Sequence, residues 1–172
     1  MTVGERLEGL PALVAPNTQL VVLGSFPGAA SLAAQQYYAH PQNQFWRILA
    51  TLFQADVEQV RSASYAFKTA WLLAQGVGVW DVYASCEREG SLDAKIRNPV
   101  VNDFAALRQR CTGLSAVAHN GAESFRHAHQ LQAFGLPVYK LPSTSPANAS
   151  WSFERKLAAW RSVFLQHGLI SS

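Results

Sequence analysis

The 172-residue sequence has few cysteines, few charges and no long apolar run. Its two cysteines, Cys86 and Cys111, belong to no CxxC or Cys/His cluster, which argues against a disulfide framework and a thiolate metal site. We expect both to be buried thiols. No apolar run approaches the roughly 18 residues that span a bilayer, and the first residues, MTVGERLEG, lack the apolar core of a signal peptide. We therefore expect a cytoplasmic protein without a membrane segment.

Charge is sparse, at 15% of the residues, and the formal net charge is only +3. This small excess tolerates a polyanionic partner without requiring one. The basic residues are scattered and form no block typical of a disordered nucleic-acid-binding tail. If the protein binds nucleic acid, folding has to gather these charges onto one face.

Hydrophobic residues make up 49% of the chain, enough to bury a substantial core in a single domain, residues 1–172. Apolar segments between turn residues predict four buried strands, at residues 19–23, 78–82, 115–119 and 137–141. Helical patterns lie between and after them, at residues 43–53, 57–73, 102–111, 122–134 and 151–167. This alternation predicts an α/β fold, a three-layer sandwich with a central four-stranded parallel sheet flanked by helices on both faces. Residues 83–99 are polar, and we expect a surface loop with a short helical turn.

The loops after the four predicted strands are expected to meet, because parallel strands place their carboxyl ends at one edge of a sheet. The loops contain GSFPG, WDVYASCEREGSLD, HNGAES and PSTSPANAS, and YYAHPQNQFW follows the first. Gly24 and Pro27 allow the backbone to turn sharply after the first strand. The edge is rich in amide, hydroxyl and aromatic groups, with one strand-end carboxylate, Asp81. It offers neither a nucleophile paired with a base nor a metal-ligand cluster, which suits recognition and electrostatic stabilisation.

Two segments resemble a known family. GSFPG followed by YYAHPQNQFW, and LPSTSPANAS near the C-terminus, resemble the signature loops of the uracil-DNA glycosylase superfamily over nearly the whole chain. AHPQNQFW is similar to the mismatch-specific uracil/thymine branch, and the full set with WDV and SLD most closely resembles the hypoxanthine (deoxyinosine) branch. The sequence departs from the superfamily at Phe26, where Asp or Asn usually handles the attacking water. It departs again at Ser143, where His or Asn usually opens the second motif.

The resemblance implies a monofunctional DNA glycosylase that flips a deaminated base, hypoxanthine above all, out of double-stranded DNA and hydrolyses its N-glycosidic bond. It implies no metal or organic cofactor, and a monomer is the default for this class. Two alternatives stay open. One is a glycosylase for uracil or mismatched thymine, and the other is a damaged-DNA-binding protein that has lost hydrolysis. A small-nucleotide-binding protein is a weaker third, because the chain has neither GxGxxG nor a P-loop lysine.

Asn43 is the candidate catalytic residue, because its amide can accept from a water while its other end holds the loop or substrate. The resemblance supports this role, and helix capping is the structural alternative. Asp81 is a candidate base reader: an ionised carboxylate would accept from N1–H of hypoxanthine and repel N1 of adenine. Uracil presents the same amide face. A turn or cap aspartate is the alternative there.

The other candidate residues fall into three groups. The base-binding set adds Ser25 and the aromatic residues Phe26 and Tyr38, which could equally be core aromatics, as could Tyr37. His40 joins Gly24 and Pro27 as a residue expected to organise the first loop. The last loop could contact the DNA backbone or the orphaned partner base through Ser143, Thr144, Ser145, Pro146 and Asn148. Alternatively it is a rigid turn, with Ser150 as the N-cap of the last helix.

Overall fold

The four predicted strands form one parallel sheet in the computed structural model, which describes residues 5–172. Its order is β3-β2-β6-β7, and every neighbouring pair is parallel. The strands are β2 (Leu20–Gly24), β3 (Val77–Asp81), β6 (Ala116–Asn120) and β7 (Val138–Leu141). Each boundary lies within one residue of its predicted position, so the strand predictions are confirmed.

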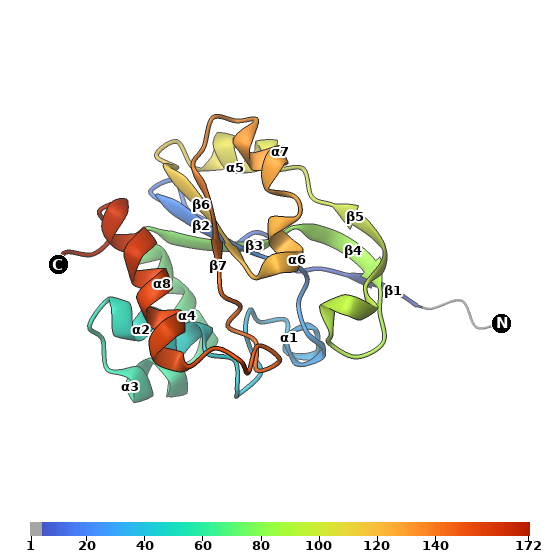
Figure 1. Cartoon of the computed structure of the whole chain (residues 1–172), viewed down its shortest axis with the longest axis horizontal. Coiled ribbons are helices and arrows are strands. Elements are labelled where there is room, and N and C mark those ends of the chain that lie inside the picture. The colour runs from blue at the N-terminus through green and yellow to red at the C-terminus, as the bar shows by residue number, and fades with distance from the viewer. Residues whose placement is uncertain (1–4) are drawn as a thin grey trace.

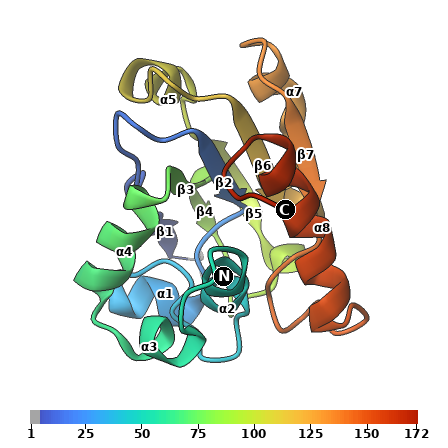
Figure 2. The same cartoon turned by 90° about the vertical axis from the view of Figure 1, so that its left-hand side faces the viewer.

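Both faces of this sheet are buried, which explains why its strands read as continuous apolar runs. Along β2, Leu20 and Val22 face one hydrophobic cluster, and Val21 and Leu23 face the other. Helices contribute buried side chains to the first cluster from α2 (Phe45–Leu52), α3 (Val57–Ser62), α4 (Tyr65–Ala74) and α8 (Phe153–Gln166). The second cluster is covered by α5 (Ala105–Arg110) and α7 (Ala128–Gln132). Figure 2 shows the sheet between these two helical layers, which confirms the predicted sandwich.

A second, antiparallel sheet takes up both ends of the surface loop expected at residues 83–99, so that prediction is wrong at residues 83–87 and 97–99, while residues 88–96 form a loop. Its order is β1-β4-β5, from β1 (Arg6–Glu8), β4 (Tyr83–Glu87) and β5 (Arg97–Val101). These strands were not predictable from the sequence, because the edges of the sheet are polar and exposed. Pro99 within β5 also argues against a strand, and it is tolerated only because β5 is an edge strand. The predicted helical turn is present as the 3-10 helix η1 (Asp93–Lys95). Figure 1 shows the hairpin that carries η1 beside the first loop of the parallel sheet.

Helix boundaries differ from the predictions where side chains cap the backbone. The helix predicted at residues 57–73 is divided into α3 and α4, because Asp56 and Ser64 each accept from a backbone N–H three residues ahead. The last helix is capped by Ser152, not by Ser150 as expected. The segment 122–134 is likewise two short helices, α6 (Ala122–Phe125) and α7. A further short helix, α1 (Ala29–Ala34), follows the first loop and was not predicted.

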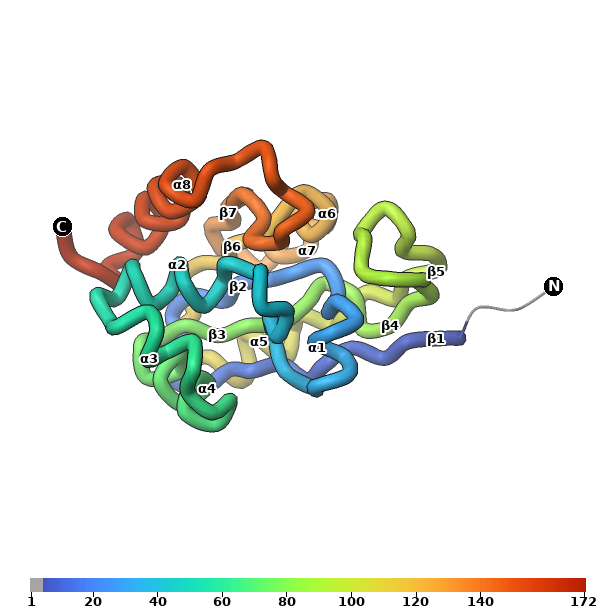
Figure 3. Tube along the Cα trace, turned by 90° about the horizontal axis from the view of Figure 1, so that it is seen from below, coloured from blue at the N-terminus to red at the C-terminus, as the bar shows by residue number. Residues whose placement is uncertain are grey.

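The carboxyl edge of the parallel sheet gathers the loops, as the topology requires. Gly24 pairs with Asp81 across β2 and β3, and Asn120 pairs with Leu141 across β6 and β7. Figure 3 shows the connection from β7 to α8 passing close to the segment between α1 and α2. Elsewhere, Cys86 and Cys111 are buried free thiols, as predicted. In the described part of the chain, no helix combines the length and apolarity needed to cross a membrane.

Candidate active site

A cavity of about 920 Å³ opens at the carboxyl edge of the parallel sheet. Its walls come from the loops after all four strands of that sheet and from the hairpin that carries η1. Every site residue expected from the sequence lies in its lining: Gly24, Ser25, Phe26, Pro27, Tyr38, His40, Asn43, Asp81, Ser143, Thr144, Ser145, Pro146 and Asn148. This volume is within the range of small-molecule sites, roughly 300–1,000 Å³, so size alone does not choose between a purine and a pyrimidine nucleotide.

Asp81 lies in the cavity wall at the end of β3 and is only 4% exposed. Its Oδ2 atom is buried and has no hydrogen-bond partner. A Cβ atom on Gly24 would lie 2.5 Å from Asp81 Oδ1, so only glycine leaves room for this carboxyl group. Burial raises the pKa of Asp81 to about 7; the Asp93 carboxyl group adds to the rise and Arg88 opposes it. Ionising the Asp81 side chain at neutral pH is therefore much costlier than ionising an aspartate in water.

A second carboxyl group, Asp93 in η1, reaches the cavity from the hairpin. Ser25 Oγ donates to Asp93 Oδ1 over 2.6 Å, which joins the first loop to the hairpin. Arg88 strengthens the same junction, because its Nη2 donates to Pro27 O over 2.6 Å. Burial raises the pKa of Asp93, and the hydrogen bond from Ser25 opposes that rise. Ser25 is thus committed to Asp93 in this conformation.

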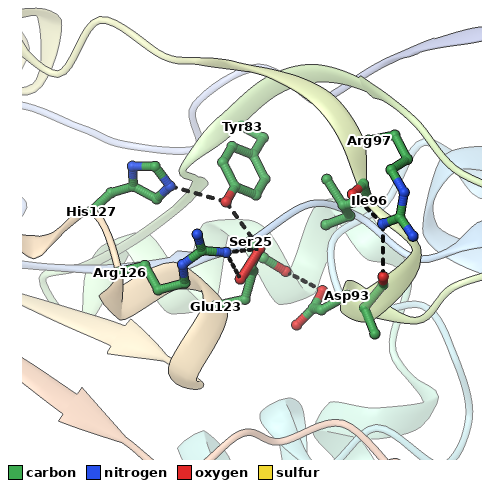
Figure 4. A network of polar contacts seen from close by, with 9 residues as sticks. Ser25, Tyr83, Asp93, Ile96, Arg97, Glu123, Arg126 and His127 are labelled. Carbon is green, nitrogen blue, oxygen red and sulfur yellow. Dashed lines mark hydrogen bonds and ion pairs between the residues drawn. The ribbon is translucent and has the colours of Figure 1, made fainter.

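Figure 4 shows the polar contacts that surround this Ser25–Asp93 pair. Arg97 Nη1 donates to Ala94 O and Ile96 O, each over 2.9 Å, and so holds the turn that carries Asp93. Tyr83 Oη donates to Glu123 Oε1 over 3.1 Å. The charge of Glu123 in turn raises the pKa of Asp93. The acidic side of the cavity therefore rests on a network of fixed polar contacts.

Aromatic side chains form another part of the lining. Tyr38 stacks on Phe45 with ring centroids 4.1 Å apart, and its backbone adopts the left-handed conformation at φ 55°. Phe26 is 7% exposed and lies beneath the Arg88 guanidinium, 5.3 Å from its centre to the ring centroid. Tyr37 is more clearly structural, because its hydroxyl donates to Pro11 O over 2.7 Å. Tyr38 packs against the first hydrophobic cluster and Phe26 belongs to the second, so both rings are core residues that also line the cavity.

Asn43 lies at the start of α2, at the rim of the cavity. Its Oδ1 accepts from Phe45 N over 2.9 Å, so the side chain contributes to the helix start as well as to the cavity lining. The two roles considered for Asn43 are compatible, since an amide oxygen has a second lone pair and the amide nitrogen has two N–H groups. His40 Nδ1 accepts from Gln42 N over 3.1 Å, a contact within the loop that leads to Asn43.

Asn120, at the end of β6, ties the opposite wall together. Its Nδ2 donates to Tyr38 Oη over 3.1 Å and to Thr144 Oγ1 over 3.0 Å, and its Oδ1 accepts from Thr144 N over 3.0 Å. Thr144 O also accepts from Gln44 N over 3.0 Å. Thr144 is fully buried, so its hydroxyl anchors the loop instead of facing a phosphate as expected.

The remaining loop residues are held by short-range contacts. Ser143 Oγ accepts from Ser145 N over 3.1 Å, and Asn148 Nδ2 donates to Ser143 O over 3.2 Å. Pro146 is exposed at the tip of this loop. Because these contacts preset the loop conformation, little ordering is needed before it meets a ligand.

Sequence reasoning missed Asn120 and Asp93 as site residues. Asn120 follows His119 at the end of an otherwise apolar strand, and a polar residue at a strand end pointing to the loop edge was the available signal. Asp93 belongs to the SLD segment, whose approach to Ser25 depends on the β4–β5 hairpin that the sequence did not reveal.

A parallel four-stranded sheet with a cavity at its carboxyl edge, lined by the GSFPG and PSTSPANAS loops, defines the class of protein. The sequence model of the uracil DNA glycosylase superfamily matches residues 11–164, and the chain belongs to that superfamily.

Two relatives from Methanosarcina species are similar to this chain over nearly their whole length. The hypoxanthine DNA glycosylase of Methanosarcina acetivorans is 35% identical over 156 residues, which cover 91% of this chain and 96% of that protein. The hypoxanthine DNA glycosylase of Methanosarcina barkeri is 33% identical over 159 residues, covering 92% and 98%. A solution NMR structure of a Methanosarcina acetivorans protein, provisionally assigned as a uracil DNA glycosylase, matches with a TM-score of 0.84 and 32% identity. That match covers 95% of this chain and 99% of the other.

Proposed function

We propose that this protein is a monofunctional DNA glycosylase that removes hypoxanthine from double-stranded DNA and leaves an abasic site. The observation that carries the proposal is Asp81, a residue of the cavity lining whose Oδ2 atom is buried without a hydrogen-bond partner. The two relatives named as hypoxanthine DNA glycosylases support the choice of base, since each aligns over more than nine tenths of the chain.

The recognition chemistry follows from the hydrogen-bonding edge of the base. An ionised Asp81 accepts from N1–H of hypoxanthine, whereas N1 of adenine is itself an acceptor and is repelled. Asp81 is only 4% exposed, so water competes little for its carboxyl group and the contrast between acceptor and donor is strong. Phe26 and Tyr38 both line the cavity and supply aromatic surface for contact with a flipped base.

Hydrolysis needs a positioned water and stabilisation of charge. The bond between C1′ and N9 breaks with its electron pair leaving on the base, the sugar becomes oxocarbenium-like, and water adds to C1′. The water supplies the new hydroxyl group, and its remaining proton balances the charge on the departing base. Asn43 orients this water through its amide, while the phosphates of the DNA itself favour the cationic sugar.

These proposed catalytic roles differ from those in the usual superfamily pattern. Phe26 cannot orient a water, and Ser143 holds the backbone of its own loop. Asn43 therefore carries the positioning role alone, and the rate depends on bond cleavage running ahead of water attack. We further propose that the enzyme works as a monomer in the cytoplasm.

The decisive experiment measures base release from duplexes that each carry one inosine, uracil, mismatched thymine or xanthine, with a chelator present and alkali used to reveal abasic sites. Inosine release by the wild type should fall about 100-fold or more in Asn43→Ala. Thermal unfolding checks that the variant is folded, since the lost helix-start contact costs about 1 kcal/mol.

The other outcomes reassign the protein. Release of uracil or thymine without inosine would identify a mismatch-type glycosylase. Tight binding to lesion DNA with no release at any enzyme excess would identify a damage-binding protein of the same fold. Full inosine release by Asn43→Ala would remove Asn43 from the mechanism.

A further inference from the structure

A second, smaller cavity of about 260 Å³ lies beside the candidate active site. Asn43 belongs to the walls of both cavities, so the two are separated only by the loop that carries it. The smaller cavity differs in character, because two of its wall residues are arginines. Its lining consists of Pro41, Gln42, Asn43, Gln44, Arg47 and Arg61.

Contacts within the protein restrain both arginines. The Arg47 guanidinium lies over the Phe153 ring of α8, with its central carbon 3.6 Å from the ring centroid. Arg61 Nη2 donates to Pro41 O over 3.3 Å, which ties α3 to the loop before Asn43. Stacking on a ring uses the face of a guanidinium and leaves the N–H groups at its edge free to donate. Two fixed guanidinium groups on one small cavity are suited to an anion with several acceptor oxygens.

Neighbouring acids do little to neutralise this charge. The nearest carboxylate contact is Glu58 Oε1, 3.5 Å from Arg61 Nη1, and the Glu58 side chain is 83% exposed. An exposed pair of this length is weak and is readily displaced by a better anion.

Gln44, another residue of this lining, carries an unsatisfied amide. Gln44 Oε1 is buried without a hydrogen-bond partner. Because the amide can turn about its last bond, its N–H₂ group can replace the oxygen and donate to an anion.

We propose that this arginine cavity binds a backbone phosphate of the DNA strand that carries the lesion, next to the flipped nucleotide. The inference rests on the proposed function. Asn43, which the proposed function places at C1′ of that nucleotide, lines both cavities. The DNA strand continues from this sugar through the neighbouring phosphates. The Arg47 and Arg61 side chains then meet the strand as it leaves the active site, which fixes the register without reading sequence.

The first test is the salt dependence of binding to an undamaged duplex. Each phosphate neutralised contributes about −0.9 to the slope of log K against log salt. Arg47→Gln and Arg61→Gln should each flatten the slope by up to about one unit and weaken binding about fivefold at roughly 0.15 M salt. Arg110→Gln is the matched control, since Arg110 is exposed on α5, at the opposite end of the molecule from α3 in Figure 2.

The second test removes the charge from the DNA. Duplexes carry a neutral methylphosphonate at single positions on either side of a 2′-fluorinated inosine, which resists cleavage because fluorine disfavours the cationic sugar. At one position the neutral linkage should weaken binding of the wild type about fivefold yet have no effect on Arg47→Gln/Arg61→Gln.

The proposal fails if the arginine variants keep the wild-type salt slope or if Arg110→Gln flattens the slope equally. It also fails if the effects of the arginine substitutions and of the methylphosphonate on the binding free energy are additive at every position tested. These outcomes are independent of catalysis, since undamaged and uncleavable DNA are used. Wild-type protein that releases no inosine but shows the expected slopes would refute the proposed function and leave the phosphate site standing.

Discussion

Asp81 is the residue at which stability and function oppose each other. A carboxyl group with no partner for Oδ2 and a pKa raised to about 7 is costly to ionise in the folded protein. Its folded pKa lies above its unfolded value of about 3.9. The folded state therefore holds a proton that the unfolded state has released between these pH values, and stability falls as the pH rises toward 7.

Asp81→Asn should consequently stabilise the protein at pH 8 and have a smaller effect near pH 5. A gain of about 1–3 kcal/mol is expected at the higher pH, because each unit of pKa shift corresponds to about 1.4 kcal/mol and relaxation reduces the full amount. Denaturant unfolding of wild type and variant at both pH values measures it. A gain that is the same at pH 5 and pH 8 would show that the carboxyl group does not titrate in this range.

The same ionisation governs excision. If ionised Asp81 accepts from N1–H, inosine release by the wild type should fall as the pH drops below about 7, with single-turnover rates as the measurement. Asp81→Asn keeps an acceptor oxygen but cannot ionise, so its rate should lack this acidic limb. A wild-type rate that is constant from pH 5 to pH 8 would contradict the assignment.

At the scale of elements, Asn120 connects three segments that are far apart in the sequence. It joins the end of β6 to Tyr38 before α2 and to Thr144 in the loop before α8. Asn120→Ala leaves buried partners unsatisfied, so a loss of about 1–3 kcal/mol in unfolding free energy is expected. Asn17→Ala, which loses one exposed bond to Leu73 O, is the control and should change stability by less than about 0.5 kcal/mol.

Hydrogen exchange separates a local effect of Asn120→Ala from a global one. The amide of Gln44, which donates to Thr144 O, should exchange faster. The exchange rates of the β2 amides should change only as much as the global stability of the variant predicts. Equal acceleration at both places would mean that Asn120 supports the whole fold and not the junction of the loops.

The elements differed in how far the sequence revealed them. The strands of the parallel sheet were predictable because each is apolar on both faces and buried between two layers. Strand β4 was not predictable, because polar residues such as Ser85 and Glu87 give it no apolar pattern. It is a strand because it pairs with β1, which lies nearly 80 residues earlier in the sequence. Helix α4 begins at Tyr65 because Ser64 caps it with a hydrogen bond that the apolar periodicity does not encode.

The site was predictable to a similar extent. The convergence of the loops followed from parallel topology, and it places Asn43 and Asp81 on one cavity. The ionisation state of Asp81 depends on burial and on Asp93, neither of which periodicity can show. The burial of Thr144 depends on its hydrogen bonds with Asn120, which lies on another element and is not visible in the sequence pattern around Thr144.

At the scale of the whole molecule, one sheet serves two hydrophobic clusters. Alternate residues of β2 face opposite clusters, so neither layer can be lost without exposing a face of the shared strands. This arrangement predicts that residues 5–172 unfold in one cooperative transition, although the two clusters are built from different helices.

Paired substitutions on the two sides of the sheet test this cooperativity. Leu72 of α4 and Leu107 of α5 are both buried, one in each cluster. Leu72→Ala and Leu107→Ala should each cost about 2–5 kcal/mol. In both variants the near-ultraviolet and far-ultraviolet circular dichroism transitions should shift together to lower denaturant. If Leu107→Ala instead produced a separate early transition while α8 and its side of the sheet stayed folded, the two layers would be independent units. The cavity at their shared edge would then open before the fold is lost.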